Sequence, residues 1–258
     1  GNAATVEKIA VSAVMAGCLP DYMPIVIAAV QAILRPEFDL TEMQATTHCT
    51  APLLIVNGPA RVECGPVSSG FGALGPGHRA NASIGRALRL AMINIGGGRP
   101  GTSDMALLGH PGKFTYCLAE DEQSSPFEPL HVSRGFAEQD SVVTVVGAEA
   151  PHSVMFSGNA DLPDNASRLL DVLAIGLTNA ATNNAVLGGG AATVVLNPEH
   201  ALILAGAGLT REQICAELYQ RCYFQMPADN PFRPIKSGKK SSGRSKRYCF
   251  NSPEQILL

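Results

Sequence analysis

The stretch of the sequence best suited to binding chemistry is residues 68–90, a glycine-rich loop that leads into an expected helix. The loop contains four closely spaced glycines, Gly70, Gly72, Gly75 and Gly77. Arg79 stands at the entrance of the helix, and Asn81 or Ser83 can cap it. Free N–H groups, the positive end of a helix dipole and a guanidinium together favour an anion. The segment therefore predicts a site for a carboxylate, a phosphate or another small anion.

The same loop is a poor match to the nucleotide-binding motifs. Gly70, Gly72 and Gly75 have the GxGxxG spacing, but the residues before them do not predict a strand and Pro76 interrupts the step into the helix. No lysine follows Gly77, as a Walker loop requires. A small-anion site is therefore preferred, and a purely structural loop beside solvated arginines is the alternative.

A second group of reactive side chains falls between residues 113 and 131. Its members are Lys113, Cys117, Glu120 and His131. Residues 114–118 predict a short strand, and alternation along it would place Lys113 and Cys117 on one face. A thiol, a carboxylate and a lysine can support acyl chemistry at a carbonyl or nitrile, with the histidine as a further proton carrier. The alternative is a loop of solvated charges.

Cys18 is the other candidate nucleophile. Residues 6–15 predict a strand, and Pro20 can open a helix that includes the apolar run 25–34. A thiol between a strand end and a helix N-terminus is expected to have a lowered pKa. We therefore expect Cys18 to be more reactive than Cys117, although a buried structural thiol remains the alternative for either.

Together these residues predict an enzyme that acts on a small anionic substrate by hydrolytic or lyase chemistry. Two alternatives remain open. One is a thiol-redox or metal-binding protein that uses Cys18, His48, Cys49 and Cys64, and the other is a non-catalytic subunit of a larger complex. Because His48 and Cys49 have no second pair at zinc-finger spacing, no metal site is assigned. The sequence leaves any cofactor unknown.

Composition narrows the environment and the partners. The formal net charge of −3 over 258 residues gives no general attraction to nucleic acid or to anionic membranes, and no run of 18 apolar residues suggests a membrane span. Seven cysteines without CxxC spacing favour free thiols and a cytoplasmic setting. Nucleic acid is not an expected partner, even though residues 236–247 are basic.

The pattern of apolar runs predicts an α/β fold with a mixed or largely parallel sheet and flanking helices. We expect an α/β domain over residues 1–235, with a possible subdomain boundary near 150. A flexible basic loop over 236–247 and the start of a further strand over 248–258 should follow. Because the last strand has no evident partner within the chain, a homo-oligomer or a complementing chain is expected to cover it.

Four blocks of sequence support a family resemblance. They are VEKIAVSAVMAGC at 6–18, LIVNGP at 54–59, GALGPGHRANASIGRALRL at 72–90 and VVLNPEH at 194–200. In scattered blocks over residues 5–222 the chain resembles the bacterial UGSC family (seleno)proteins. That family is named for a Sec/Cys-Gly-Ser-Cys motif, which this sequence lacks. The resemblance therefore implies an enzyme-like α/β protein and carries no redox chemistry with it.

Overall fold

The chain forms two compact units, which divide near Pro151. The computed structural model describes residues 2–75, 77–159, 162–179, 182, 185, 190–226 and 245–258. Unit 1 comprises residues 1–124 and 128–151, and unit 2 comprises 125–127 and 152–258. Each unit has its own apolar core.

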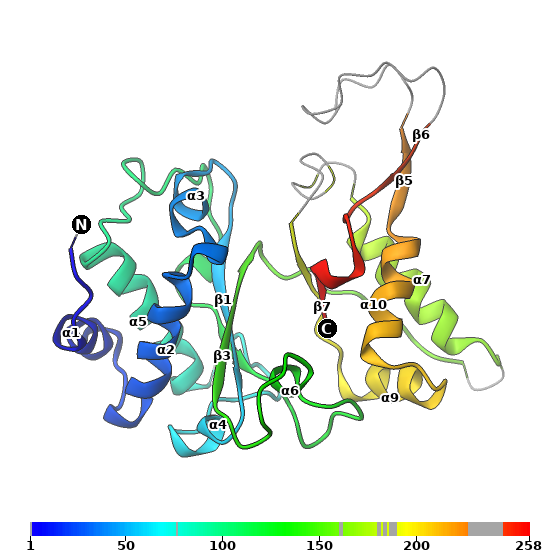
Figure 1. Ribbon diagram of the computed structural model, residues 1–258, viewed down its shortest axis with the longest axis horizontal. Helices are drawn as coiled ribbons and strands as arrows, with labels where there is room; N and C mark the ends of the chain where they lie inside the picture. The colour runs from blue at the N-terminus through cyan, green and yellow to red at the C-terminus, as the bar shows by residue number, and fades with distance from the viewer. Residues whose placement is uncertain are drawn as a thin grey trace. The chain divides into compact units, whose positions relative to one another are not determined.

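Unit 1 combines helices with a three-stranded sheet (Figure 1). Its α-helices are α1 (Val6–Ala16), α2 (Met23–Ile33), α3 (Leu40–Ala45), α4 (Ala60–Glu63), α5 (Arg79–Asn94) and α6 (Leu130–Ser133). Its strands are β1 (Ala51–Asn57), β2 (Cys117–Ala119) and β3 (Val142–Ala148). Three short 3₁₀ helices complete it, η1 (Pro20–Tyr22), η2 (Pro36–Phe38) and η3 (Pro111–Lys113).

Unit 2 is built mainly from helices. Its α-helices are α7 (Asn165–Leu177), α9 (Pro198–Gly206) and α10 (Arg211–Arg221). Its strands are β4 (Ala192–Thr193), β5 (Tyr223–Met226), β6 (Ser245–Tyr248) and β7 (Ile256–Leu257), with η4 (Pro253–Gln255) before the last. The helix starts follow the sequence signals: Asn197 caps α9, and Thr210 with Gln213 forms a capping box on α10.

The sheet of unit 1 is mixed, which confirms the predicted α/β class. β1 lies in the centre, parallel to β2 and antiparallel to β3. The connection from β1 to β2 contains α5, so the three elements form a β–α–β crossover. This topology places the loop before α5 at the carboxyl end of β1.

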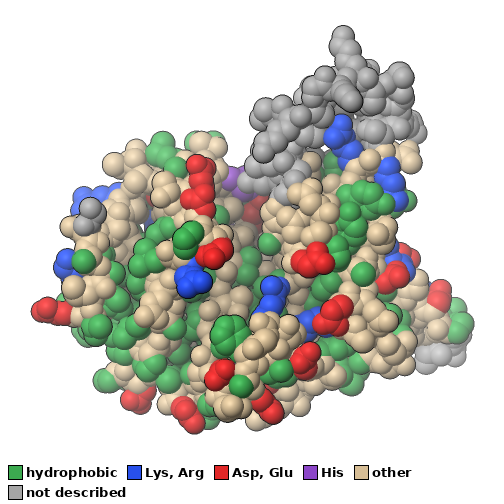
Figure 2. Space-filling model, viewed as in Figure 1, with side chains coloured by type: hydrophobic (Ala, Val, Ile, Leu, Met, Phe, Trp, Pro, Cys, Tyr) green, Lys and Arg blue, Asp and Glu red, His purple; other side chains and the backbone are tan. Residues whose placement is uncertain are grey.

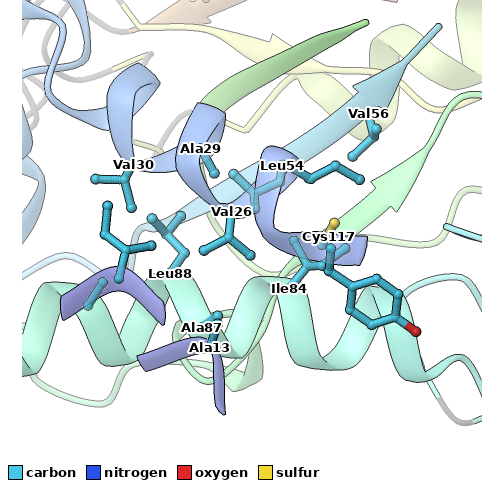
Figure 3. Close-up of a cluster of buried hydrophobic side chains, with 14 of the residues drawn as sticks. Ala13, Val26, Ala29, Val30, Leu54, Val56, Ile84, Ala87, Leu88 and Cys117 are labelled. Carbon is cyan, nitrogen blue, oxygen red and sulfur yellow. The ribbon is translucent and has the colours of Figure 1, made fainter. Parts of the chain in front are cut away.

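Two helices, α2 and α5, cover one face of that sheet, and α1 packs against these helices on the side away from the strands (Figure 1). Figure 3 shows Leu54 and Val56 of β1 pointing toward Val26 of α2 and Ile84 of α5, and all four are at most 2% exposed. Burying side chains of this size contributes about 1.5–3 kcal/mol each. The packing fixes the height and tilt of α5 over the strands.

The strand predicted for residues 6–15 is wrong, because these residues form α1. Thr5 caps the helix and Gly17 ends it in the left-handed region, with φ of 83°. Ile9, Ser12 and Ala13 are buried at helical spacing. The alternation of apolar and polar residues led to the wrong prediction, because small residues such as Ala and Ser are compatible with both the strand period and the helix period. Cys18 therefore follows a helix and not a strand.

The strand predicted over 114–118 is shorter and shifted. β2 begins at Cys117, and Lys113 lies in η3. Lys113 and Cys117 therefore do not share a strand face, contrary to the prediction.

The end of the chain also differs from expectation. Residues 245–247 of the predicted basic loop belong to β6, and the rest of that loop, 236–244, lies outside the described residues. Ile256 and Leu257 form β7, which is buried and pairs in parallel with β4. An unpaired final strand is therefore no longer a reason to expect an oligomer.

The surface agrees with the near-neutral composition. On the face shown in Figure 2, acidic and basic side chains are interspersed, and neither sign gathers into a continuous patch. Within the part of the chain that the structure describes, no helix is both long and apolar enough to cross a membrane.

Two glycines with positive φ give a matched test of this fold. Gly17→Ala should cost about 1–2 kcal/mol of unfolding free energy, because only the left-handed backbone is penalised and a Cβ there meets nothing within 4 Å. Gly58→Ala should cost about 3 kcal/mol or more, because its Cβ would also overlap the carbonyl oxygen of Asp140. Denaturant unfolding measures both. Equal losses would show that the turn after β1 is not packed as described.

Candidate functional site

The glycine-rich loop lies where α/β proteins commonly bind ligands. It follows β1 and ends at α5, so the helix N-terminus faces the carboxyl end of the parallel pair β1 and β2. His78 is the N-cap residue, and its side chain makes no capping hydrogen bond. The first helical bond runs from the Ala82 N–H to the His78 carbonyl, so the N–H groups of residues 79–81 precede the helical ladder. The helix thus presents donors toward the loop.

Asn81 and Ser83 do not cap α5, contrary to prediction, because the helix already begins at Arg79. The Asn81 side chain is buried, at 2% exposed. Its Oδ1 accepts from the Ser68 N–H at 2.8 Å, and its Nδ2 donates to the carbonyl oxygens of Ser68 and Cys117. The Ser83 hydroxyl donates to the Arg79 carbonyl. Asn81 therefore holds the start of the loop against β2.

Cys18 and Arg79 lie together at the first turns of α5. The Arg79 Nε donates to the Gly17 carbonyl at 3.1 Å, and the Cys18 thiol donates to the Ser83 carbonyl at 3.3 Å. The structure thus brings together Cys18, Arg79, Asn81, Ser83 and Cys117 around the N-terminal part of α5. All four glycines of the loop are exposed.

Cys18 does not have the lowered pKa that the sequence suggested, and the pKa of Cys117 is raised as well. Burial raises the pKa of Cys18, and this outweighs the hydrogen bond with Ser83 and the charge of Arg79, which lower it. Burial, with a smaller contribution from Cys18, raises the pKa of Cys117 to about 12. Cys18 follows the C-terminus of α1, where the dipole does not favour a thiolate. Both thiols are therefore protonated at neutral pH.

A second cluster stands at the carboxyl ends of β1 and β2 and contains the predicted Glu120. The Asn57 Nδ2 donates to Glu120 Oε2 at 2.6 Å and to Glu122 Oε1 at 2.9 Å. The Leu130 N–H donates to Glu120 Oε2, and the Gly58 N–H donates to Glu122 Oε1. Asn57 thus fixes two carboxylates side by side where the two strands end.

Arg61 balances part of this negative charge. Its Nη2 lies 2.8 Å from Glu122 Oε2, and its Nη1 donates to the Glu120 carbonyl at 3.0 Å. Its Nε donates to the Gly58 carbonyl. One guanidinium therefore ties the Glu122 carboxylate to the backbone of Glu120 and to the turn at Gly58.

His131 approaches the same carboxylates from α6. Its Nε2 lies 3.3 Å from the Glu138 carbonyl, which can only accept, so Nε2 carries the hydrogen. Its Nδ1 is left with a lone pair, is buried without a hydrogen-bond partner and lies 4.0 Å from Glu122 Oε1. The Asn57 Oδ1 is also buried without a partner. The cluster therefore holds two buried acceptors without a hydrogen-bond partner beside its carboxylates.

The two clusters meet at the end of β2. The Ala119 N–H donates to the Ser68 carbonyl at 3.1 Å, and Ser68 is the residue that Asn81 holds. Glu120 follows Ala119 directly. The glycine-rich loop therefore begins beside the residue that precedes Glu120 in the chain. Lys113 is not part of this site, since it pairs with Asp104.

The sequence patterns did not reveal Asn57, Arg61 and Glu122 as site residues. The available signal was the position of Asn57, the last residue of a buried strand, followed at once by a glycine turn. An asparagine at the end of a strand is a weaker indication of a functional site than a histidine or a cysteine. Its importance comes from the neighbouring strand, which supplies the two carboxylates.

The metal-binding alternative finds no support among the described residues, where no three or more His, Cys, Asp or Glu side chains gather suitably for a metal ion. His48 is paired with Glu149 instead. No protein-family model, curated protein or solved structure matches the chain.

Asn57→Asp tests the paired carboxylates. A third carboxylate beside Glu120 and Glu122 should cost about 3–5 kcal/mol of unfolding free energy near neutral pH. Crowding raises the pKa of a carboxyl in the folded protein above its unfolded value, so the folded variant binds more protons and the loss should shrink as pH falls. Urea unfolding across an acidic pH series measures this. Asn94→Asp, at an exposed position, is the control, and a pH-independent loss would contradict the pairing.

Alkylation tests the state of the thiols. Native Cys18 should react slowly with iodoacetamide at neutral pH, and its rate should still rise above pH 9.0, the ordinary pKa of a thiol. Cys117 should react only after denaturation, because it is 2% exposed. Peptide mass spectrometry reads each site, with the partly exposed Cys49 as the internal reference. A Cys18 rate that levels off at neutral pH would refute this assignment.

Proposed function

We propose that the protein is an enzyme that acts on a small anionic substrate by hydrolytic or lyase chemistry. The observation that carries the proposal is the contact between Ser68 and Ala119, which joins the start of the loop before α5 to the strand end that leads into Glu120. An anion-binding helix end and a carboxylate held at strand ends are the two parts that such chemistry needs.

The anion would lie against the loop and the first turn of α5. The N–H groups of residues 79–81 and the positive end of a 16-residue helix favour a carboxylate or phosphate there. Arg79 uses its Nε on Gly17, and its exposed guanidinium leaves further N–H groups for the anion. The backbone of the loop could approach the ligand closely, because glycines have no side chains to stand in the way. These glycines are Gly70, Gly72, Gly75 and Gly77.

Proton transfer would fall to Glu120. It is partly exposed, whereas His131 is 1% exposed, so Glu120 is the group able to touch a substrate. Asn57 and the Leu130 N–H orient its carboxylate. His131 would act behind it as a positioning residue, because its Nδ1 lies 4.0 Å from Glu122 Oε1, which Asn57 holds beside Glu120.

A thiol nucleophile is less well supported than acid–base chemistry. Cys18 lies beside the proposed anion site, but its raised pKa keeps it protonated. A bound anion nearby would raise that pKa further, because like charges disfavour the thiolate. Cys18 therefore has a packing role against α5 in this proposal, and the Glu120 carboxylate carries out the proton transfer.

Two variants separate binding from chemistry. For a substrate found by screening small esters, amides, hydroxy acids and phosphomonoesters, Arg79→Ala should raise KM about 5- to 150-fold, the equivalent of about 1–3 kcal/mol. Glu120→Gln should lower kcat by roughly 10²- to 10⁴-fold with little change in KM. Steady-state kinetics with product detection by NMR gives both values.

Arg99→Ala is the matched control, because Arg99 is an exposed arginine just beyond α5. Its KM and kcat should remain those of the wild type. An unchanged KM in a folded Arg79→Ala protein would remove the anion site. An unchanged kcat in Glu120→Gln would remove the proposed base.

A further inference from the structure

A buried charge cluster at the other end of β1 surrounds a small cavity. Its lining includes Thr50 and Pro52 near the start of β1, and Gln44, Arg89 and Lys113. The proposed active site lies beyond Asn57, where the same strand ends. The cavity is therefore separate from that site, and its binding properties do not depend on the proposed function.

Two cations share one carboxylate beside this cavity. The Arg89 Nη2 lies 2.7 Å from Asp104 Oδ2, and the Lys113 Nζ lies 2.8 Å from Asp104 Oδ1. The side chains of Arg89, Asp104 and Lys113 are 10%, 4% and 13% exposed. Burial acts to raise the pKa of Asp104, but Lys113 and Arg89 outweigh it, so the pKa is lowered and the carboxylate is ionised. One positive charge is left in excess.

Arg86, on the same helix as Arg89, adds to this positive potential. Burial and the charge of Arg89 lower the pKa of Arg86, which lies one turn earlier on α5 and stacks over the Phe114 ring. Buried cations that outnumber the carboxylate they share are costly, and proteins normally compensate such an excess. The carboxylate at hand, Asp104, is already shared.

The remaining lining supplies polar groups and a size limit. The Gln44 Oε1 accepts from Arg89, which leaves the Gln44 amide N–H groups as further donors. Pro52, Leu88 and Met92 close other sides with apolar atoms. The cavity measures about 10 Å³, about the room that one water molecule needs. A carboxylate or phosphate would not fit, whereas a monatomic ion needs only a small outward adjustment of the side chains.

We propose that this cavity binds a single halide ion, held by Lys113, Arg89 and the Gln44 amide. The ion would neutralise the excess charge of the Arg89–Asp104–Lys113 cluster. Its binding would couple three segments of unit 1: α3 through Gln44, α5 through Arg89 and η3 through Lys113. Chloride is the natural occupant, and bromide is the probe that can be seen directly.

Bromide tests the proposal in the crystal. Crystals of the wild-type protein soaked in sodium bromide should show an anomalous peak in the cavity. Lys113→Gln removes the excess charge and should abolish that peak, whereas Lys8→Gln, at an exposed lysine of α1, should retain it. A water without anomalous signal in the wild-type cavity would overturn the proposal, as would equal occupancy in Lys113→Gln.

Thermal unfolding of the wild-type protein in solution provides a second test, which does not require the Lys113→Gln variant to fold. At constant ionic strength, replacing gluconate by bromide should raise the wild-type Tm along a curve that saturates, because ligands that bind only the folded state stabilise it. Lys8→Gln should follow the wild type, and a folded Lys113→Gln should lose the rise. The same wild-type Tm in both salts would refute halide binding.

Discussion

The buried side-chain amide of Asn81, in α5, makes hydrogen bonds to three backbone groups from two other segments of unit 1. It accepts from the Ser68 N–H and donates to the carbonyl oxygens of Ser68 and Cys117. Without this amide the Ser68 N–H would lose the acceptor shown here, at a cost of about 1–3 kcal/mol. The glycine-rich loop, the helix and β2 therefore keep one mutual arrangement, and both parts of the proposed active site depend on it.

The packing beneath this amide makes the arrangement rigid. α5 is buried along most of its length between α1 and the strands, and Ile84 and Leu88 lie in the shared core with Leu54 (Figure 3). Gly85 allows the close approach, because a Cβ there would press on Thr115 and on the Tyr116 nitrogen. A helix seated this closely can hold its N-terminal donors at a fixed height above the strand ends, as anion binding requires.

A group of charged side chains lies at each end of β1. At its carboxyl end, Asn57 gathers two carboxylates around one arginine. At its amino end, Arg89 and Lys113 gather around one carboxylate. Both groupings are buried enough that solvent screens them weakly. The strand thus separates the carboxylates to which we assign proton transfer from the cations to which we assign a halide.

Local signals in the sequence determined the elements that begin with clear capping residues or consist of a continuous apolar run. Asn197 before Pro198 and the Thr210 capping box located α9 and α10, and the apolar run 53–56 located β1. The mixed α/β class followed from the alternation of such elements. Local signals failed for residues 6–15, where small residues suit both a strand and a helix, and the choice was made by packing against α5.

The candidate site was predictable only where it rests on local sequence. The glycine loop and Arg79 before α5 could be read directly from their order in the chain. The cluster at the strand ends could not, because Asn57 meets Glu120 and Glu122, 63 and 65 residues away, only through the parallel pairing of β1 with β2. The protonation of Cys18 was likewise decided by burial, which a sequence does not display. The order of residues in the chain thus determined the glycine-rich loop and the helix that follows it, and the tertiary structure alone decided which side chains lie beside them, because those side chains are distant in sequence.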